Sequence, residues 1–308
     1  MKLSAEELRQ DEHMAQFHAM SGEAEILADG ELCLPRRPFF SHKGDYGKVL
    51  IVGGSVGYTG APSLCARAAV RSGAGLVYLG VPESVYAVTA VKNDEAMPFP
   101  LASRNGALAA SAAEEILLRS ENCNLCAIGP GLGRAEGTVL AVQQVIRECR
   151  TPLVLDADAL YAASEDMSLL KKAKVPLILT PHEGEYLRMG GVCGADRAAG
   201  AVEFAEKYGC ILVLKGHRTM IAFPNGEIFI NSHGNPGMAK GGSGDVLTGV
   251  IAAMVGQFGV EQGVKLGVYL HGLAGDLCCG ALGEYAMTAG DVIEALPAAT
   301  MKMMKTGV

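Results

Sequence analysis

Short apolar runs alternate with longer segments of helical spacing along most of the chain from residue 48 onward. The runs predict strands, and the segments with apolar residues three or four positions apart predict helices. Strands are predicted at 49–52, 75–81, 125–128, 153–155, 177–179 and 211–214, and helices at 61–72, 105–119, 136–149 and 198–208. This alternation is typical of βαβ units, so the pattern predicts an α/β fold with a doubly wound, mostly parallel sheet flanked by helices.

The pattern changes after residue 218. Two apolar runs, 219–223 and 227–231, are separated by Pro224, Asn225 and Gly226, which is a hairpin signal. We therefore expect an antiparallel hairpin at one edge of the sheet. The remaining chain is predicted to be helical at 246–255, 262–277 and 290–296.

The first 40 residues lack the alternating pattern of the rest of the chain. A short helix is predicted near residues 5–20, and the Pro-Arg-Arg-Pro stretch at 35–38 interrupts regular structure. We treat residues 1–40 as an N-terminal extension and residues 41–308 as one domain, because no repeat, low-complexity tract or linker divides them.

Composition supports a globular protein and excludes some classes. Hydrophobic residues make up 49% of the chain, which is enough for a large core. The formal net charge of −7 argues against a nucleic-acid-binding protein, which needs a concentrated basic surface. No uncharged run is long enough to span a membrane and the N-terminus lacks an apolar signal core, so we expect a cytoplasmic protein without a membrane partner.

The nine cysteines indicate free thiols in a reducing compartment rather than a metal or redox site. Cys123 and Cys126 form a CxxC pair, and Cys278 is followed by Cys279. A second CxxC at zinc-ribbon spacing is missing from the sequence, so the sequence does not favour a zinc site.

The stretch GNPGMAKGGSGD at 234–245, followed by the apolar run 246–255, carries the strongest chemical signal. Glycines at 241, 242 and 244 allow a phosphate to approach backbone N–H groups, and the start of a helix favours anions. A carboxylate beside a phosphate is unfavourable for binding alone, so Asp245 is interpreted as a base that accepts a proton from an attacking hydroxyl. The alternative is a glycine-rich loop that ends in an Asp N-cap.

Other loops that follow predicted strands are also glycine-rich or polar, and ligands of open α/β sheets bind at such loops. GGSVGYTGAP at 53–62 resembles a dinucleotide loop but lacks the G-x-G-x-x-G spacing, so a plain strand-to-helix turn is equally compatible. GPGLG at 129–133 is a second glycine-rich loop. Asp156 and Asp158 follow the strand at 153–155; Asp156 could organise a hydrated magnesium ion or brace a loop, and Asp158 could cap the next helix.

Two more loops carry candidate side chains. His182 lies in TPHEGE at 180–185, either as a structural residue or at the apex of a functional turn, and no second His completes a zinc motif. Lys215 begins KGHRT at 215–219, where it could face nucleotide phosphates or extend to solvent. Because the Walker pattern is absent, the loops together predict phosphoryl transfer in a cleft that is not a P-loop.

Four motifs in order give a specific resemblance: KGDYG at 43–47, GPGLG at 129–133, TPHEGE at 180–185 and NPGMAKGGSGDVL at 235–247. Over residues 43–296 the chain resembles the ADP/ATP-dependent NAD(P)H-hydrate dehydratases, the carboxyl-terminal domain of YjeF-type repair proteins. The resemblance implies a ribokinase-like fold. It also implies ADP- or ATP-dependent dehydration of the S epimer of NADH or NADPH hydrate, with release of phosphate and AMP or ADP through a phosphorylated intermediate.

The resemblance also implies roles for particular residues. Asp245 would be the catalytic base. The anion hole would be formed by Gly241, Gly242, Ser243 and Gly244; the adenine nucleotide would contact Lys215, Gly216, His217, Arg218, Thr219 and Gly244; and the hydrated cofactor would contact Ala61, Gly131, His182 and Asp245. Mg²⁺ is expected with the nucleotide, without protein ligands that the motifs identify.

The family pattern implies two further properties and leaves two rival functions open. It implies a homo-oligomer and a functional pairing with a separate NAD(P)H-hydrate epimerase, because the epimerase half of fused relatives is missing from this sequence. Lys240 departs from the pattern, in which Thr is more usual. A small-molecule kinase of the same fold, acting on a vitamin precursor or a sugar, is the nearest alternative, and a nucleotide-binding regulatory protein without turnover is the second.

Overall fold

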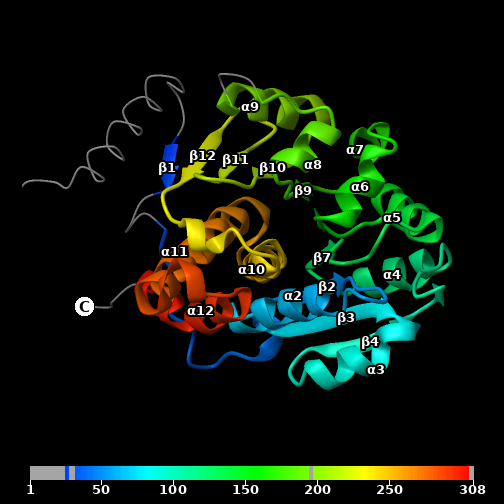
Figure 1. The fold of residues 1–308 in the computed structure, drawn as a ribbon, viewed down its shortest axis with the longest axis horizontal. Coiled ribbons are helices and arrows are strands. Elements are labelled where there is room, and N and C mark those ends of the chain that lie inside the picture. Colours follow the sequence, from blue (N-terminus) through cyan, green and yellow to red (C-terminus); the bar gives the residue numbers. More distant parts are fainter. Residues whose placement is uncertain (1–24, 28–31, 194–196, 305–308) are drawn as a thin grey trace, which may run out of the picture.

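The computed structural model describes residues 25–27, 32–193 and 197–304 of the 308-residue chain. A ten-stranded sheet crosses the molecule in the order β1-β12-β11-β10-β9-β8-β7-β2-β3-β4 (Figure 1). Neighbouring strands from β4 to β10 are parallel, whereas β10, β11 and β12 are antiparallel neighbours. The mostly parallel, doubly wound sheet and the antiparallel hairpin β11–β12 are therefore confirmed.

The strands are short and nearly all buried. Their bounds are β1 Glu25–Leu27, β2 Lys48–Val52, β3 Leu76–Pro82, β4 Met97–Leu101, β5 Ser103–Arg104, β6 Ala107–Leu108, β7 Leu125–Ile128, β8 Leu153–Leu155, β9 Leu177–Leu179, β10 Ile211–Leu214, β11 Met220–Ala222 and β12 Ile228–Asn231. β1 pairs in parallel with β12, and β5 pairs with β6 in a separate two-stranded sheet. Leu27 and Leu34 belong to the main core, so the described part of the segment before residue 41 packs on the domain.

Helices cover both faces of the sheet (Figure 1). Their bounds are α2 Gly60–Arg71, α3 Glu83–Lys92, α4 Ala112–Ser120, α5 Glu136–Glu148, α6 Asp158–Ser164, α7 Ser168–Lys172, α8 Glu183–Arg188, α9 Arg197–Tyr208, α10 Ser243–Phe258, α11 Val260–Ala286 and α12 Ala289–Met303, with 3-10 turns at Lys43–Tyr46 and Pro236–Met238. Residues of α2, α10, α11 and α12 form one core cluster with one face of the sheet, and residues of α4 to α9 form a second with the other face.

The strand order reverses between β2 and β7. The chain leaves β2 toward β3 and β4, and then returns to place β7 on the other side of β2. In open α/β sheets the crevice at such a reversal, beyond the carboxyl ends of the strands, is the usual ligand site. The loops that leave these two strands meet there, because Gly54 donates its backbone N–H to the carbonyl of Pro130.

The bounds of one predicted helix were wrong, and the strand β4 was not predicted. The helix predicted at 105–119 begins only at Ala112, because Asn105 and Gly106, both at positive φ, form the turn of the β5–β6 hairpin. An Asn-Gly pair is a strong signal for such a turn. The strand β4 was missed because its sequence, MPFPL, contains two prolines. β4 lies at the edge of the sheet, where a missing N–H is tolerated.

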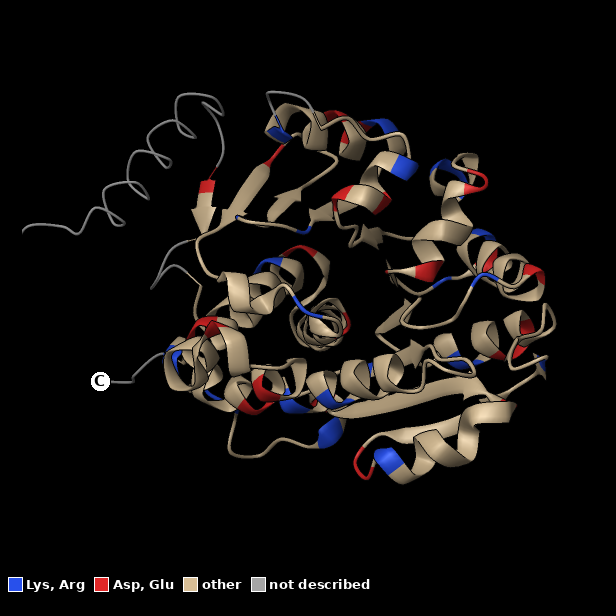
Figure 2. Cartoon of the chain, viewed as in Figure 1, with Lys and Arg blue, Asp and Glu red and all other residues tan. Residues whose placement is uncertain are grey.

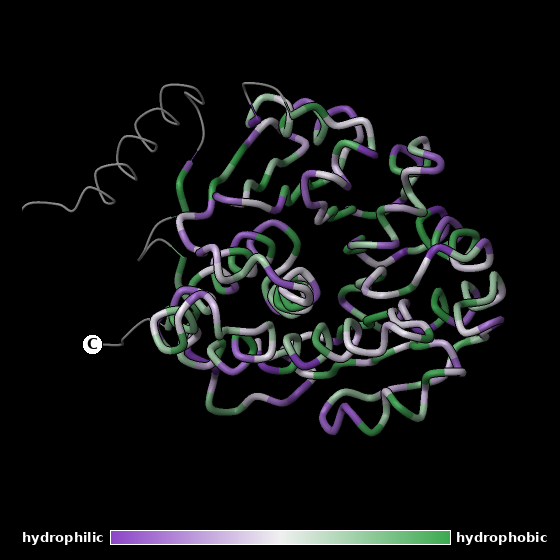
Figure 3. The backbone as a smooth tube through the Cα atoms, viewed as in Figure 1, coloured by the Kyte–Doolittle hydropathy of each residue, from purple (hydrophilic) through white to green (hydrophobic). Residues whose placement is uncertain are grey.

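The C-terminal helices are longer than predicted and mostly buried. α11 is long and apolar enough to cross a membrane by composition, but 61% of its most apolar window is buried inside the fold. Figure 3 shows α10 and the sheet as mainly hydrophobic, and Figure 2 shows charged residues mainly on the outer helices. The helix predicted near residues 5–20 lies outside the described residues.

Candidate active site

The anion loop, residues 241–244, leads directly into α10. Gly242 is the N-cap residue of α10 at φ 96°, a conformation that favours glycine, and a side chain there would also collide with Leu64. Within the described part of the chain, the backbone N–H groups of Gly241, Gly242, Gly244 and Asp245 have no acceptor. Four free N–H groups at the start of a 16-residue helix are suited to bind an anion. Ser243, also predicted to belong to the anion hole, differs, because its N–H donates to the Lys240 carbonyl at 3.3 Å.

Asp245 lies in the first turn of α10, next to these N–H groups. Burial and the nearby carboxylate of Asp156 raise its pKa from 3.8 to about 7, although Lys215 acts in the opposite direction. Among the described residues, the Asp245 carboxylate has no hydrogen-bond partner. A carboxylate that is partly buried, unpaired and close to neutral in pKa suits a general base at neutral pH.

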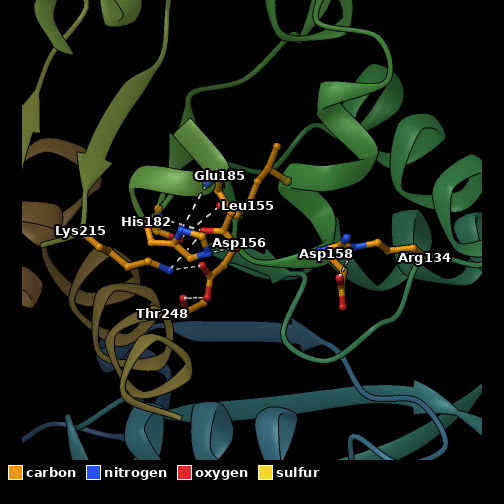
Figure 4. A network of polar contacts seen from close by, with 9 residues as sticks. Arg134, Leu155, Asp156, Asp158, His182, Glu185, Lys215 and Thr248 are labelled. Atoms are coloured by element: carbon orange, nitrogen blue, oxygen red, sulfur yellow. Dashed lines mark hydrogen bonds and ion pairs between the residues drawn. The ribbon is translucent and has the colours of Figure 1, made fainter. Parts of the chain in front are cut away.

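Lys215 extends from the end of β10 across the sheet to β8 (Figure 4). Its Nζ donates a hydrogen bond to Oδ1 of Asp156 at 2.8 Å and lies 3.9 Å from Oε2 of Glu185. Burial lowers the pKa of Lys215, but Asp156 and Glu185 outweigh this effect, so the net pKa is raised and the ammonium is charged. A Cβ atom on Gly244 would lie 3.2 Å from Nζ, which places this charge beside the anion loop.

Asp156 is buried and fully engaged. Its Oδ2 accepts a hydrogen bond from Oγ1 of Thr248 at 2.7 Å, and its Oδ1 accepts from Lys215 (Figure 4). Gly129 makes room for this loop, because a Cβ there would lie 1.8 Å from the Asp156 carbonyl oxygen. Asp156 therefore braces Lys215 and α10, which is the loop-bracing alternative from the sequence.

His182 is the N-cap residue of α8. Its Nδ1 accepts a hydrogen bond from the backbone N–H of Glu185 at 3.2 Å, and Glu185 Oε2 accepts from the backbone N–H of His182 at 2.8 Å. This capping role leaves Nε2 facing Glu185 Oε1 at 3.5 Å and the ring 61% exposed. An isolated parallel β-bridge pairs the backbone of His182 with that of Lys215, whose ammonium lies beside the anion loop.

Ala61 and Gly131 lie side by side in the segments that follow β2 and β7, where the strand order reverses. A Cβ on Gly131 would lie 3.1 Å from the Ala61 Cβ and 2.9 Å from the Tyr58 carbonyl oxygen, and Ser55 Oγ donates to the Gly131 carbonyl at 2.8 Å. Two of the four predicted contacts of the hydrated cofactor are therefore neighbours. Sequence reasoning did not single out Ser55.

The turn 216–219 folds back on itself. Gly216 has φ 156°, and the carbonyls of Lys215 and His217 accept hydrogen bonds from Arg197. Arg218, at φ 58°, donates to the Ser232 carbonyl at 2.6 Å, and Thr219 Oγ1 donates to the Gly216 carbonyl at 3.3 Å. The Arg218 guanidinium is therefore bonded to the segment of the same chain that follows β12.

Two side chains of α11 hydrogen bond to the anion loop and to the segment that precedes it. His271 is buried and hydrogen bonded to the backbone of Ser243, and burial lowers its pKa to about 4, so it is neutral at neutral pH. Asp276 accepts hydrogen bonds from Asn235 Nδ2 at 2.9 Å and from the Gly234 N–H at 3.1 Å. Neither α11 side chain was predicted, since nothing in the sequence places this helix behind residues 234–243.

Lys240 points away from the anion loop. Its Nζ donates to the carbonyls of Tyr285 at 2.7 Å and Met287 at 2.6 Å, at the C-terminal end of α11. A cation there satisfies carbonyls that the helix leaves unpaired. The departure from Thr thus adds a helix-end contact and leaves the glycine N–H groups untouched.

Asp158 does not cap α6, contrary to the prediction. Ala157 is the N-cap residue, and the Asp158 carboxylate accepts from the Gly133 N–H at 2.8 Å and from Arg134 Nε at 3.2 Å (Figure 4). The carboxylate therefore fixes the loop 129–133 that follows β7.

Comparison with known proteins identifies the fold and the family. A family model described as NAD(P)H-hydrate dehydratase matches residues 49–298. The chain belongs to the NAD(P)H-hydrate dehydratase family. Its ribokinase-like architecture is shared with an Enterococcus faecalis ribokinase-like superfamily protein (TM-score 0.80, 28% identity, covering 92% of this chain and 97% of that one).

Two dehydratase relatives cover most of the chain. It is 37% identical over 270 residues to the ADP-dependent (S)-NAD(P)H-hydrate dehydratase of Bacillus subtilis, covering 86% of this chain and 92% of the relative. A crystal structure of the B. subtilis ADP/ATP-dependent NAD(P)H-hydrate dehydratase, co-crystallised with ATP and Mg²⁺, superposes with a TM-score of 0.75 at 35% identity, covering 88% of this chain and 95% of that one.

Bifunctional relatives are longer. The chain is 47% identical over 271 residues to the bifunctional NAD(P)H-hydrate repair enzyme Nnr of Moorella thermoacetica, covering 86% of this chain and 51% of the relative. It thus spans about half the length of such bifunctional enzymes.

The dehydratase site fits a metal that arrives with a nucleotide. Within residues 25–27, 32–193 and 197–304, no group of three His, Cys, Asp or Glu side chains could hold a metal ion. Asp156, for which a role beside magnesium was one of two alternatives, is already bonded to Lys215 and Thr248. Mg²⁺ commonly keeps several waters and binds through substrate phosphates with few carboxylates, which suits this site.

Proposed function

We propose that this protein repairs damaged nicotinamide cofactors. In the proposed reaction, ADP or ATP phosphorylates the ring hydroxyl of the S epimer of NADH or NADPH hydrate. Elimination then regenerates NADH or NADPH and releases phosphate with AMP or ADP. The observation that carries the proposal is the Asp245 carboxylate, unpaired and with a pKa of about 7, beside the free N–H groups of the anion loop.

In the first step Asp245 accepts the proton of the ring hydroxyl as its oxygen attacks the terminal phosphorus of the nucleotide. The bond between that phosphorus and the bridging oxygen breaks, and the shorter nucleotide leaves. The free N–H groups of Gly241, Gly242, Gly244 and Asp245 and the ammonium of Lys215 stabilise negative charge on the transferring phosphoryl oxygens. Mg²⁺ bound to the nucleotide would neutralise further phosphate charge.

In the second step the carbon–oxygen bond of the phosphorylated ring breaks. The electron pair of the ring nitrogen assists departure of phosphate, a far better leaving group than hydroxide, and loss of a ring proton restores the double bond. Ala61, Gly131 and His182 would hold the nicotinamide side of the substrate, and the turn 215–219 with Gly244 the adenine nucleotide. We expect the damaged ring to lie between α2 and α8, across α10.

We also propose the compartment, the partner enzyme and the oligomeric state of this protein. All nine cysteines are free, which supports a reducing compartment and therefore the cytoplasm. The chain is similar to about half the length of relatives named bifunctional NAD(P)H-hydrate repair enzymes, which supports functional pairing with an NAD(P)H-hydrate epimerase. We also propose a homo-oligomer, which light scattering on the purified protein would test.

The test is a repair assay. Purified protein is mixed with hydrated NADH and ADP, and the reduced-nicotinamide absorbance and inorganic phosphate are followed together. We expect both to rise in equal amounts until the S epimer is consumed, with an epimerase needed for the rest. Parallel reactions with ATP and with hydrated NADPH establish the preferred donor and cofactor.

The same assay separates the rival functions. A small-molecule kinase of this fold would leave the phosphoryl group on its product, so no free phosphate would appear. A regulatory protein would bind ADP without either signal. Correctly folded protein that releases no phosphate and restores no absorbance would exclude the dehydratase function.

A further inference from the structure

A cavity lies away from the anion loop. It has a volume of about 570 Å³ and is lined by residues 34–38 before β2, by the C-terminal ends of α2 and α10, and by α12. We call it the distal cavity. Its size is within the range of pockets that bind small organic molecules, about 300–1,000 Å³.

The distal cavity is separate from the candidate active site. Asp245 lies in the first turn of α10, whereas Met254 and Phe258 line the cavity at the other end. At 1.5 Å per residue, the 13-residue step between Asp245 and Phe258 spans roughly 20 Å. The helix α2 runs in the same way from Ala61 at the active site to Ser72 at the cavity.

One wall of the cavity is apolar and its rim is cationic. Leu34, Met254 and Phe258 contribute apolar surface, while three arginines and one carboxylate, Asp45, contribute charge. The excess of cations is notable in a chain of net charge −7. A ligand that complements these walls carries an apolar body and a negative group.

The three arginines of the rim differ in how far they are already paired. Arg71 forms an ion pair with Glu294 at 3.1 Å. Arg37 donates to the Gly73 carbonyl and to Gln257, and its guanidinium stacks over the Tyr46 ring at 3.6 Å. Arg36 has no ion-pair or hydrogen-bond partner among the described residues, so its guanidinium is available to an incoming anion.

Two hydroxyl groups add polar capacity inside the cavity wall. Ser72, only 5% exposed, and Thr300 both line the cavity, and neither hydroxyl oxygen has a hydrogen-bond partner within the described residues. Buried polar groups without partners are unfavourable, so a ligand that offers them a hydrogen bond gains from it.

We propose that the distal cavity binds a small organic anion with a flat or aliphatic body. A carboxylate or phosphate group of the ligand accepts hydrogen bonds from Arg36, and the body packs between the apolar ends of α10 and α12. The hydroxyls of Ser72 and Thr300 bond to a polar substituent. This site is independent of the repair chemistry proposed above.

The test uses 2-naphthoate as the probe and isothermal titration calorimetry on the full chain. We expect saturable binding to one site per chain, with 2-naphthalenemethanol, which lacks the charge, binding about tenfold more weakly. Arg36→Ser should weaken 2-naphthoate binding about three- to tenfold, because it removes the unpaired guanidinium. The matched control Arg150→Ser, which removes an exposed arginine after α5, should change it less than about twofold.

Two further measurements complete the test. Thr300→Tyr places a ring in the cavity and should abolish binding while thermal unfolding stays cooperative; if that variant does not fold, the arginine pair decides. Saturating ADP should leave the 2-naphthoate affinity within about twofold. Absence of binding by the natural chain, equal binding by Arg36→Ser and Arg150→Ser, or displacement of 2-naphthoate by ADP would each overturn the proposal.

Discussion

The Nζ of Lys215 lies 2.8 Å from Oδ1 of Asp156, joining the ends of β10 and β8 across β9. The pair is nearly inaccessible, with side-chain exposures of 18% and 2%. It balances a buried carboxylate and holds a cation beside Gly244 at the start of α10. The stability of the fold and the proposed phosphoryl transfer therefore involve the same ion pair.

Removing the cation alone should destabilise the protein. Lys215→Met leaves Asp156 buried without its charge partner, which typically costs about 3–5 kcal/mol. The double variant Lys215→Met, Asp156→Asn removes both charges and should recover most of that loss in urea unfolding, yet turnover should stay low because the phosphoryl group lacks its cation. Recovery of turnover in the double variant would show that Lys215 acts only through stability.

Asp245→Asn should abolish repair while leaving ADP binding intact. The amide cannot accept the hydroxyl proton, and we expect turnover to fall by about 10²–10⁴-fold. Calorimetry with ADP supplies the binding control. Turnover close to that of the natural chain would remove Asp245 from the mechanism.

The same substitution should stabilise the fold at alkaline pH. The pKa of Asp245 is raised from 3.8 to about 7, so the folded chain binds this proton more tightly than the unfolded chain. The group's contribution therefore favours folding below pH 4 and becomes unfavourable as pH rises toward 7. Asp245→Asn should raise the thermal midpoint at pH 8 by a few degrees more than at pH 4, about 2–6 °C; an equal shift at both values would contradict this.

Repair should depend on pH through the same carboxylate. Only the deprotonated form of Asp245 accepts a proton, so kcat/KM should fall about tenfold per pH unit below pH 7 and level off above it. The measurement is kcat/KM from pH 5 to 9 with folding checked at each value. A plateau that extends down to pH 5 would assign the base to another group.

His182 serves as the N-cap of α8 and is proposed to contact the hydrated cofactor. His182→Ala removes both roles and should cost about 1 kcal/mol of stability. His182→Asn restores a strong N-cap, so it should regain stability while KM for the hydrated cofactor stays raised more than KM for ADP. Full recovery of KM in the Asn variant would reduce His182 to a structural role.

Lys240 bonds the carbonyls of Tyr285 and Met287, so Lys240→Thr should lower stability by about 0.5–1.5 kcal/mol. KM for ADP should change less than about threefold, because the ammonium does not face the anion loop. Lys174→Thr, at an exposed site, is the control. A large loss of ADP affinity with unchanged stability would instead place Lys240 at the phosphates.

The parallel sheet and the anion loop could be predicted because their causes are local. Buried parallel strands appear in the sequence as apolar runs, and glycines 241, 242 and 244 allow the backbone conformation that exposes N–H groups before α10. Local signals could also have corrected the two errors. Asn105 and Gly106 predict the hairpin turn that they form, and the prolines of MPFPL are compatible with an edge strand.

The partners of the site residues could not be predicted, since they come from segments far apart along the chain. The sequence alone did not decide between a metal role and a bracing role for Asp156. The fold decides it, because β8 and β10 bring Asp156 to Lys215, 59 positions away along the chain. The same holds for His271 and Asp276 behind the anion loop, and for the pKa of Asp245, which depends on burial and on Asp156. Local backbone preferences depend on neighbouring residues, whereas desolvation and charge pairing arise only when distant strands and helices pack together.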